Sequence, residues 1–167
     1  MRVEFVNPFI EAARDVLESE IGGRTDRGNI RLQKSAYTTD EVTALVGVTG
    51  RVVGMVLYSM SQATARAIVT RLLGQEFPEF DALAQSGIGE LGNVITGRAG
   101  VLLAEAGYPS NITPPALVMG KGTMITTLDL NRLVFPLTTE LGVLEIQVVL
   151  RENAAGTVAA PAIRAAA

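Results

Sequence analysis

Residues 86–100 read SGIGELGNVITGRAG, and they lie inside a longer segment, residues 80–106, whose pattern predicts the longest helix of the chain. Apolar side chains recur in this segment at three- and four-residue spacing, which is the pattern of a helix packed against a core. Each glycine in a helix interior lowers the stability of the helix by about 1 kcal/mol relative to alanine, so the number of glycines in this helix requires an explanation. The glycines in question are Gly87, Gly89, Gly92, Gly97 and Gly100.

Two interpretations of these glycines are open at this point. They let the helix pack closely on a neighbouring element, or they keep one helix face flat so that another protein can approach the backbone. Helical geometry puts Ile88, Leu91, Ile95, Ala99 and Leu102 on one stripe, and Ser86, Glu90, Asn93 and Gly97 on a different face.

Glu90 and Asn93 are neighbours on that second face, because residues three apart on a helix have Cβ atoms about 5–6 Å apart. A carboxylate and a carboxamide therefore project side by side. On spacing alone, an ordinary solvated polar face is the simpler interpretation.

The segments on either side of this helix predict an α+β fold, with helices packed on a mostly antiparallel sheet. Asn7 as N-cap and Pro8 at the first helical position indicate an opening helix that Gly22 ends, and Ser61 and Gly74 bound a second helix. Strands are expected at residues 30–37, 42–48, 52–58, 116–119, 133–137 and 143–151, and the second and third of these form a hairpin.

The composition excludes most of the usual catalytic groups. The chain has 167 residues with no cysteine and no histidine, so thiol nucleophiles, histidine-based triads and the usual zinc sites are absent. A formal charge of −3 argues against nucleic acid as a partner. The longest uncharged run, residues 52–65, is too short and too polar to span a membrane, so we expect a cytoplasmic protein.

One domain is expected over residues 1–152, followed by an Ala/Pro-rich tail over residues 153–167 that carries no chemistry. The pattern Gly87-x-Gly89-x-x-Gly92 matches a dinucleotide fingerprint, but it lies within a predicted helix instead of after a strand. Gly120-Lys121-Gly122-Thr123 lacks the spacing of a phosphate loop and is expected to be a turn between strands.

The motif Ser86-xxx-Glu90-xx-Asn93 resembles the Ser/Asp-xxx-Glu-xx-Asn signature of the CheC, CheX and FliY phosphatases, and its glycine-rich setting resembles the CheX branch closely. The similarity extends over roughly residues 3–151. The first helix carries Glu11-Ala-Ala-Arg14, with arginine where a second site would need its amide, so one site per chain is expected.

This resemblance implies a CheC/CheX-like fold and hydrolysis of the aspartyl phosphate of a CheY-like receiver domain. Asn93 would position the attacking water and Glu90 would bind the receiver's active-site lysine. Ser86, Gly89 and Gly97 would contact the partner. The Mg²⁺ would belong to the phosphorylated receiver, so no cofactor or metal site of the chain's own is expected, and the family resemblance also implies a homodimer.

Two other functions remain possible on the sequence. One is a CheX-like module that binds a receiver domain or a motility or signalling component without accelerating hydrolysis. The other is a purely structural α+β domain, which leaves the adjacent acid and amide unexplained.

Overall fold

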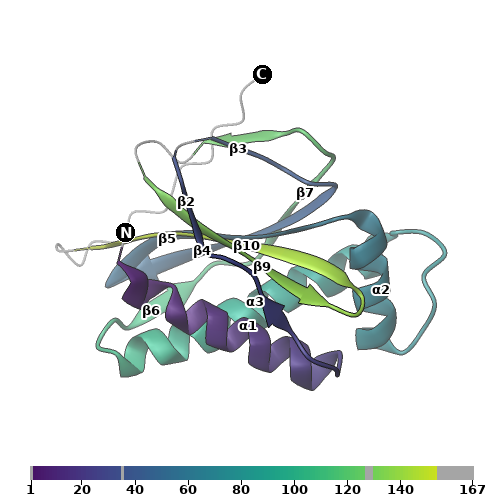
Figure 1. Cartoon of the computed structure of the whole chain (residues 1–167), viewed down its shortest axis with the longest axis horizontal. Coiled ribbons are helices and arrows are strands. Elements are labelled where there is room, and N and C mark those ends of the chain that lie inside the picture. Colours follow the sequence, from purple (N-terminus) through teal and green to yellow (C-terminus); the bar gives the residue numbers. More distant parts are fainter. Residues whose placement is uncertain (1, 35, 127–129, 154–167) are drawn as a thin grey trace.

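The computed structural model describes residues 2–34, 36–126 and 130–153. Three helices form one layer under a curved antiparallel sheet (Figure 1). The helices are α1 (Asn7–Glu20), α2 (Gln62–Leu73) and α3 (Ala82–Glu105), and a 3₁₀ turn, η1 (Val3–Phe5), precedes α1. The fold class predicted from the sequence, α+β with helices on a mostly antiparallel sheet, is confirmed.

The main sheet has eight strands among the described residues, and all its pairings are antiparallel. Its strand order is β1-β9-β10-β5-β4-β6, with β2 also paired to β9 and β7 also paired to β4. The strands are β1 (Asp26–Arg27), β2 (Arg31–Gln33), β4 (Val42–Gly50), β5 (Val52–Met60), β6 (Ser110–Ile112), β7 (Ala116–Met119), β9 (Arg132–Thr139) and β10 (Gly142–Glu152).

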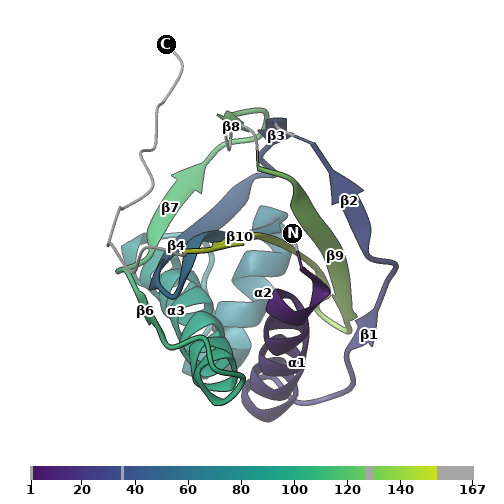
Figure 2. The same ribbon diagram turned by 90° about the vertical axis from the view of Figure 1, so that its left-hand side faces the viewer.

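Each edge of this sheet is made of two short strands in place of one long strand. On one edge β1 and β2 pair with different parts of β9, and on the other β6 and β7 pair with different parts of β4. Figure 2 shows the sheet arching over the helices between these edges, with a second, two-stranded sheet on its outer side. That small sheet pairs β3 (Ala36–Thr38) with β8 (Met124–Thr126).

The core lies between the helical layer and the inner face of the sheet. Every residue of β5 is buried, because this central strand is covered on both faces. Helices α1 and α3 contribute apolar side chains from successive turns to the inner core, including Phe9, Leu17, Ile88 and Ile95. A smaller cluster on the outer face contains Tyr37, Leu45, Met55, Leu57 and Val149.

Most of the expected elements are confirmed. The hairpin is β4–β5, and the later strands are β7, β9 and β10. Ser61 caps α2, since its Oγ accepts a hydrogen bond from the Thr64 amide at 3.1 Å, and Gly74 ends α2 with a left-handed φ of 65°. Lys121 lies in a turn between β7 and β8, as predicted.

Two expectations in the first third of the chain are wrong. Asn7 is the first residue of α1 and makes no capping hydrogen bond, and Val6 occupies the cap position. Residues 30–37 do not form one strand, because β2 pairs with β9 in the main sheet whereas β3 pairs with β8 in the small sheet. The tail predicted at residues 153–167 lies outside the described residues from 154 onward.

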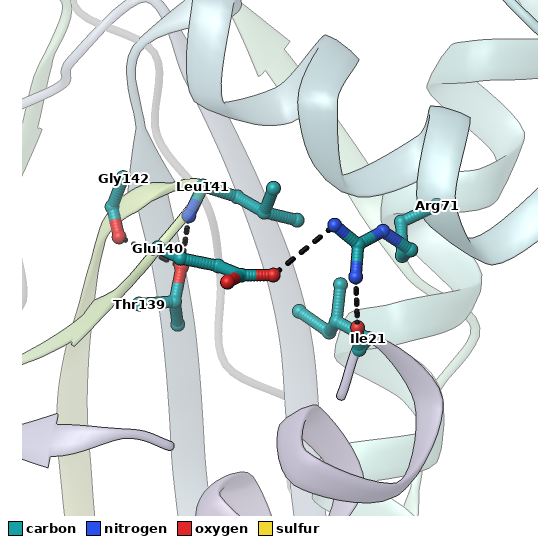
Figure 3. A network of polar contacts seen from close by, with 6 residues as sticks. All are labelled: Ile21, Arg71, Thr139, Glu140, Leu141 and Gly142. Atoms are coloured by element: carbon teal, nitrogen blue, oxygen red, sulfur yellow. Dashed lines mark hydrogen bonds and ion pairs between the residues drawn. The ribbon is translucent and has the colours of Figure 1, made fainter. Parts of the chain in front are cut away.

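Arg71 of α2 connects the end of α1 to the turn between β9 and β10 (Figure 3). Its Nη1 donates to the carbonyl of Ile21 at 2.8 Å, and its Nη2 lies 3.1 Å from Oε1 of Glu140. The same turn is closed by Thr139, whose Oγ1 donates to the Gly142 carbonyl and accepts from the Leu141 amide. Arg71 therefore fixes where α1 ends relative to α2.

Candidate functional site

Helix α3 carries the candidate site, and its ends are well defined. Asp81 caps its start by accepting a hydrogen bond from the Ala84 amide at 2.9 Å. Its end has a Schellman geometry, in which the Tyr108 amide donates to the Leu103 carbonyl and Gly107 takes a φ of 91°. The site residues thus lie in the middle turns of a helix that is capped at both ends.

The two faces of α3 differ as the sequence predicts. Ile88, Leu91, Ile95 and Ala99 are buried in the core, whereas Ser86 and Glu90 are exposed and Asn93 and Gly97 are half-buried. The fifth residue of the predicted stripe, Leu102, is only partly buried, and Leu103 completes the stripe instead.

Glu90 and Asn93 lie next to each other on the outer face of α3, three residues apart. Within the described parts of the chain, neither side chain has a hydrogen bond or an ion pair. Their acid and amide groups are consequently available to a molecule that approaches this face.

The predicted partner-binding residues lie in different surroundings. The Ser86 hydroxyl donates to the Ala82 carbonyl at 2.9 Å, within its own helix, and stays exposed. Gly97 borders the open face, with only Ile112 near the position of a Cβ, at 3.7 Å. Gly89 is buried under Pro115 and Leu117, so it lies inside the molecule and not on the face that Ser86 and Gly97 share.

Close intramolecular packing explains three of the five glycines. A Cβ on Gly87 would lie 3.0 Å from Cγ1 of Val69 in α2, and one on Gly92 would lie 3.1 Å from Cδ2 of Tyr58 in β5. Gly89 is similarly close to Leu117, at 3.3 Å. The packing interpretation therefore holds for these three, and the open-face interpretation is left for Gly97 and Gly100, since no described atom lies within 4 Å of a Cβ on Gly100.

A buried hydrogen bond anchors α3 to the sheet behind the site. Thr96 Oγ1 donates to the Gly92 carbonyl at 2.7 Å and lies 2.7 Å from the Tyr58 hydroxyl, so Tyr58 must be the donor to Thr96. Burial raises the pKa of Tyr58 well above its ordinary value. Tyr58 is accordingly a neutral donor, which holds the turn containing Asn93 against β5.

A hollow beside Glu90 is the feature of this face that sequence reasoning missed. It lies where the three helices meet, has a volume of about 230 Å³, and is called the three-helix hollow below. Val94 could have been found, because it is an apolar residue on the exposed side of α3. The lining residues from α1 and α2 could not have been found from the sequence, because the approach of these helices to α3 is set by tertiary packing. The lining residues are Val16, Glu20, Leu72, Leu73, Gly87, Glu90, Leu91 and Val94.

Two searches of the described residues bear on other kinds of site. None of their helices is long and apolar enough to cross a membrane. No three of their acidic side chains come together in a group that could hold a metal ion.

Comparison with known proteins gives a consistent result. A family model described as chemotaxis phosphatase CheX matches residues 42–138. The CheY-P phosphatase CheX of Thermotoga maritima is 35% identical over 132 residues, which cover 75% of this chain and 81% of that protein.

Solved structures agree with the sequence comparison. A CheC-like superfamily protein from Shewanella superimposes with a TM-score of 0.81 at 26% identity, covering 90% of this chain and 99% of that one. The CheX chain in a CheX-CheY-BeF3-Mg²⁺ complex from Borrelia burgdorferi superimposes with a TM-score of 0.71 at 25% identity, covering 90% of this chain and all of that one.

Proposed function

Because the chain belongs to the CheX family of chemotaxis phosphatases, we propose that it hydrolyses the aspartyl phosphate of a CheY-like receiver domain. The relationship to a CheY-P phosphatase implies a hydrolase. The observation that carries the proposal is the acid and amide of Glu90 and Asn93, which lie side by side on the outer face of α3 and have no partner among the described residues.

Asn93 is the residue that positions the attacking water. Its carboxamide has both a donor and an acceptor, so it can form two hydrogen bonds to one water molecule. These bonds orient the water so that a lone pair of its oxygen points at phosphorus. Holding the nucleophile in line replaces a chance encounter by a near-attack geometry, and this positioning is the main contribution a protein makes to phosphoryl transfer. Asn93 can serve in this way because no described residue occupies its amide.

Glu90 is the residue that binds the receiver's active-site lysine. An exposed carboxylate one helical turn from Asn93 gives a receiver cation a partner beside the reacting group. The ion pair fixes the orientation of the docked domain, and so it places Asn93 over the phosphoryl group.

The Mg²⁺ that offsets charge on the transferring phosphoryl group is a part of the receiver in this proposal. The Borrelia burgdorferi complex, in which CheX is bound to CheY with BeF3 and Mg²⁺, supports a receiver that arrives with its own ion. The residues of α3 then need only bind and orient.

The face around Glu90 and Asn93 suits a protein substrate. Leu83, Val94 and Val101 on the outer side of α3 are exposed by 52%, 41% and 59%. Exposed apolar side chains that surround a few polar groups are typical of a surface that another protein covers.

The proposal is tested by the decay of a phosphorylated CheY-like receiver from the same organism, with Mg²⁺. The wild type should accelerate decay, and Glu90→Ala and Asn93→Ala should each abolish the acceleration while circular dichroism shows an intact fold. A receiver that binds without decaying faster would refute the hydrolase and leave a CheX-like binding module.

The homodimer stays a prediction of the family resemblance, and the cytoplasmic location stays a prediction of the sequence composition. Sedimentation of the purified chain tests the first: one species at twice the chain mass supports it, and a monomer at micromolar concentration contradicts it.

A further inference from the structure

The three-helix hollow has the size of a site for one side chain. Its volume of about 230 Å³ lies below the range of about 300–1,000 Å³ that is usual for pockets that hold whole small molecules. It opens on the same face as Glu90, which is one of its lining residues. A protein docked over Glu90 would therefore cover it.

Most of the lining is apolar and some of it is exposed. Leu73 and Val94 have 45% and 41% of their surface exposed, and they come from different helices, α2 and α3. An apolar wall of this kind favours the methylene groups of a partner side chain.

Two carboxylates complete the lining, and both lack a partner within the described residues. Glu20 and Glu90 are exposed, and neither forms an ion pair or a hydrogen bond there. Arg71, which adjoins Leu72 in the sequence, directs its guanidinium to Ile21 and Glu140 (Figure 3). The hollow thus combines an apolar wall with uncompensated negative charge.

Glu20 lies at the end of a helix and beside a second carboxylate. It is the last residue of α1, at the negative end of the helix dipole, and it shares the hollow with a second carboxylate. No described residue forms an ion pair with Glu20, so a cation of a docked partner would find an unpaired carboxylate here.

We propose that the three-helix hollow receives a lysine or arginine side chain of the docked receiver domain, with its methylene groups against Leu73 and Val94 and its cation against Glu20. This side chain is additional to the active-site lysine assigned to Glu90. The inference rests on the proposed function, because it places the receiver over the same face. Glu20 is then a residue that selects the partner, not one that takes part in hydrolysis.

The test is the affinity of this protein for a CheY-like receiver of the same organism loaded with BeF3 and Mg²⁺. Glu20→Gln should raise Kd about three- to ten-fold and reduce its dependence on salt. Glu11→Gln removes the same charge from the same helix outside the hollow, and it should leave Kd unchanged. The midpoint of thermal unfolding should stay the same or rise for Glu20→Gln.

The partner's side chain is identified by replacing exposed lysines and arginines of the receiver with glutamine one at a time. One of these receiver variants should bind the wild-type protein more weakly than the unaltered receiver does. The same variant should bind Glu20→Gln no more weakly than the unaltered receiver does, because the ion pair with Glu20 is already broken. Full additivity for every basic residue would overturn the inference.

Two further outcomes separate this inference from the proposed function. Glu20→Gln and Glu11→Gln could have equal Kd values while Leu73→Ser and Val94→Ser bind more weakly. This result would overturn the proposed cation and show that the hollow receives an apolar side chain. If the wild type binds the receiver through Glu20 but does not accelerate phosphoryl decay, the phosphatase fails and the inference stands. If it binds no receiver, both fail.

Discussion

The glycines of α3 have separate roles that depend on what lies opposite each one. Gly92 faces Tyr58, which is buried and held by its hydrogen bond to Thr96, so the ring cannot yield to an added methyl group. Gly100 faces open space. The same substitution at the two positions should therefore have opposite effects on stability.

Gly92→Ala should lower the free energy of unfolding by about 1–3 kcal/mol, since overpacking at Tyr58 exceeds the gain in helix propensity. Gly100→Ala should raise it by about 0.5–1 kcal/mol, since only the propensity changes. Urea unfolding of the two variants measures both. A stabilised Gly92→Ala would mean that α3 does not approach β5 as closely as described.

The sequence predicted which residues share a face of α3 but not what each face meets. Glu90 and Asn93 follow from helical periodicity alone, and so do the buried Ile88 and Ile95. Gly89 was placed with the partner-binding residues, yet it lies under Pro115 and Leu117. Those two residues come from a segment more than twenty positions away, so no local pattern could reveal the contact.

At the scale of elements, a buried hydrogen bond from Tyr58 of β5 to Thr96 joins α3 to the sheet, in addition to the apolar contacts of the core. Burial keeps the pKa of Tyr58 above its ordinary value of about 10. The unfolded chain loses this proton near pH 10 and the folded protein keeps it, so the unfolded state binds fewer protons above that pH. Stability should consequently fall as the pH rises above 10 toward the raised pKa.

Tyr58→Phe should lower the free energy of unfolding by about 0.5–1.5 kcal/mol at pH 8, because Thr96 loses its donor. The gap between wild type and variant should narrow by up to about 1.4 kcal/mol per pH unit above pH 10, because phenylalanine has no proton to lose. Urea unfolding from pH 8 to 11 makes the comparison. A gap that stays constant across this range would contradict a buried, neutral Tyr58.

Long elements were predictable from the sequence and short ones were not. The β4–β5 hairpin and α2 have strong local patterns, namely β-branched runs and a Ser61 cap with Gly74 at the end. The strands β1, β6 and β8 are two or three residues long and exist because β9, β4 and β3 offer partners. Residues 30–37 look like one strand, but their two halves pair in different sheets.

At the scale of the whole molecule, hydrogen bonds hold the last described residue to the sheet. The last described residue, Asn153, donates its amide to the Arg51 carbonyl at 2.8 Å and its side chain to the Gly50 carbonyl at 3.1 Å. These bonds join the end of β10 to the turn of the β4–β5 hairpin.

A chain that ends at Asn153 should have a free energy of unfolding within about 0.5 kcal/mol of that of the full chain, and it should keep the proposed phosphatase activity. The reason is that the predicted tail, residues 153–167, is Ala/Pro-rich and adds no site residue. Thermal melts and receiver assays of the two chains test this. A clear loss of either property in the shorter chain would give the tail a role and move the domain boundary.

If Asn93 on the outer face of α3 directs water at a receiver's aspartyl phosphate, removal of its amide should slow hydrolysis without weakening docking. The rate of phosphoryl decay is measured at saturating wild-type protein and at saturating Asn93→Ala, with BeF3-receiver binding measured in parallel. Asn93→Ala should accelerate phosphoryl decay less than the wild type does, by a factor of about 100 or more. Its Kd for the BeF3-receiver should change by less than about twofold, because the amide positions water and contributes little to docking. An Asn93→Ala variant that still accelerates decay at the wild-type rate would contradict the account.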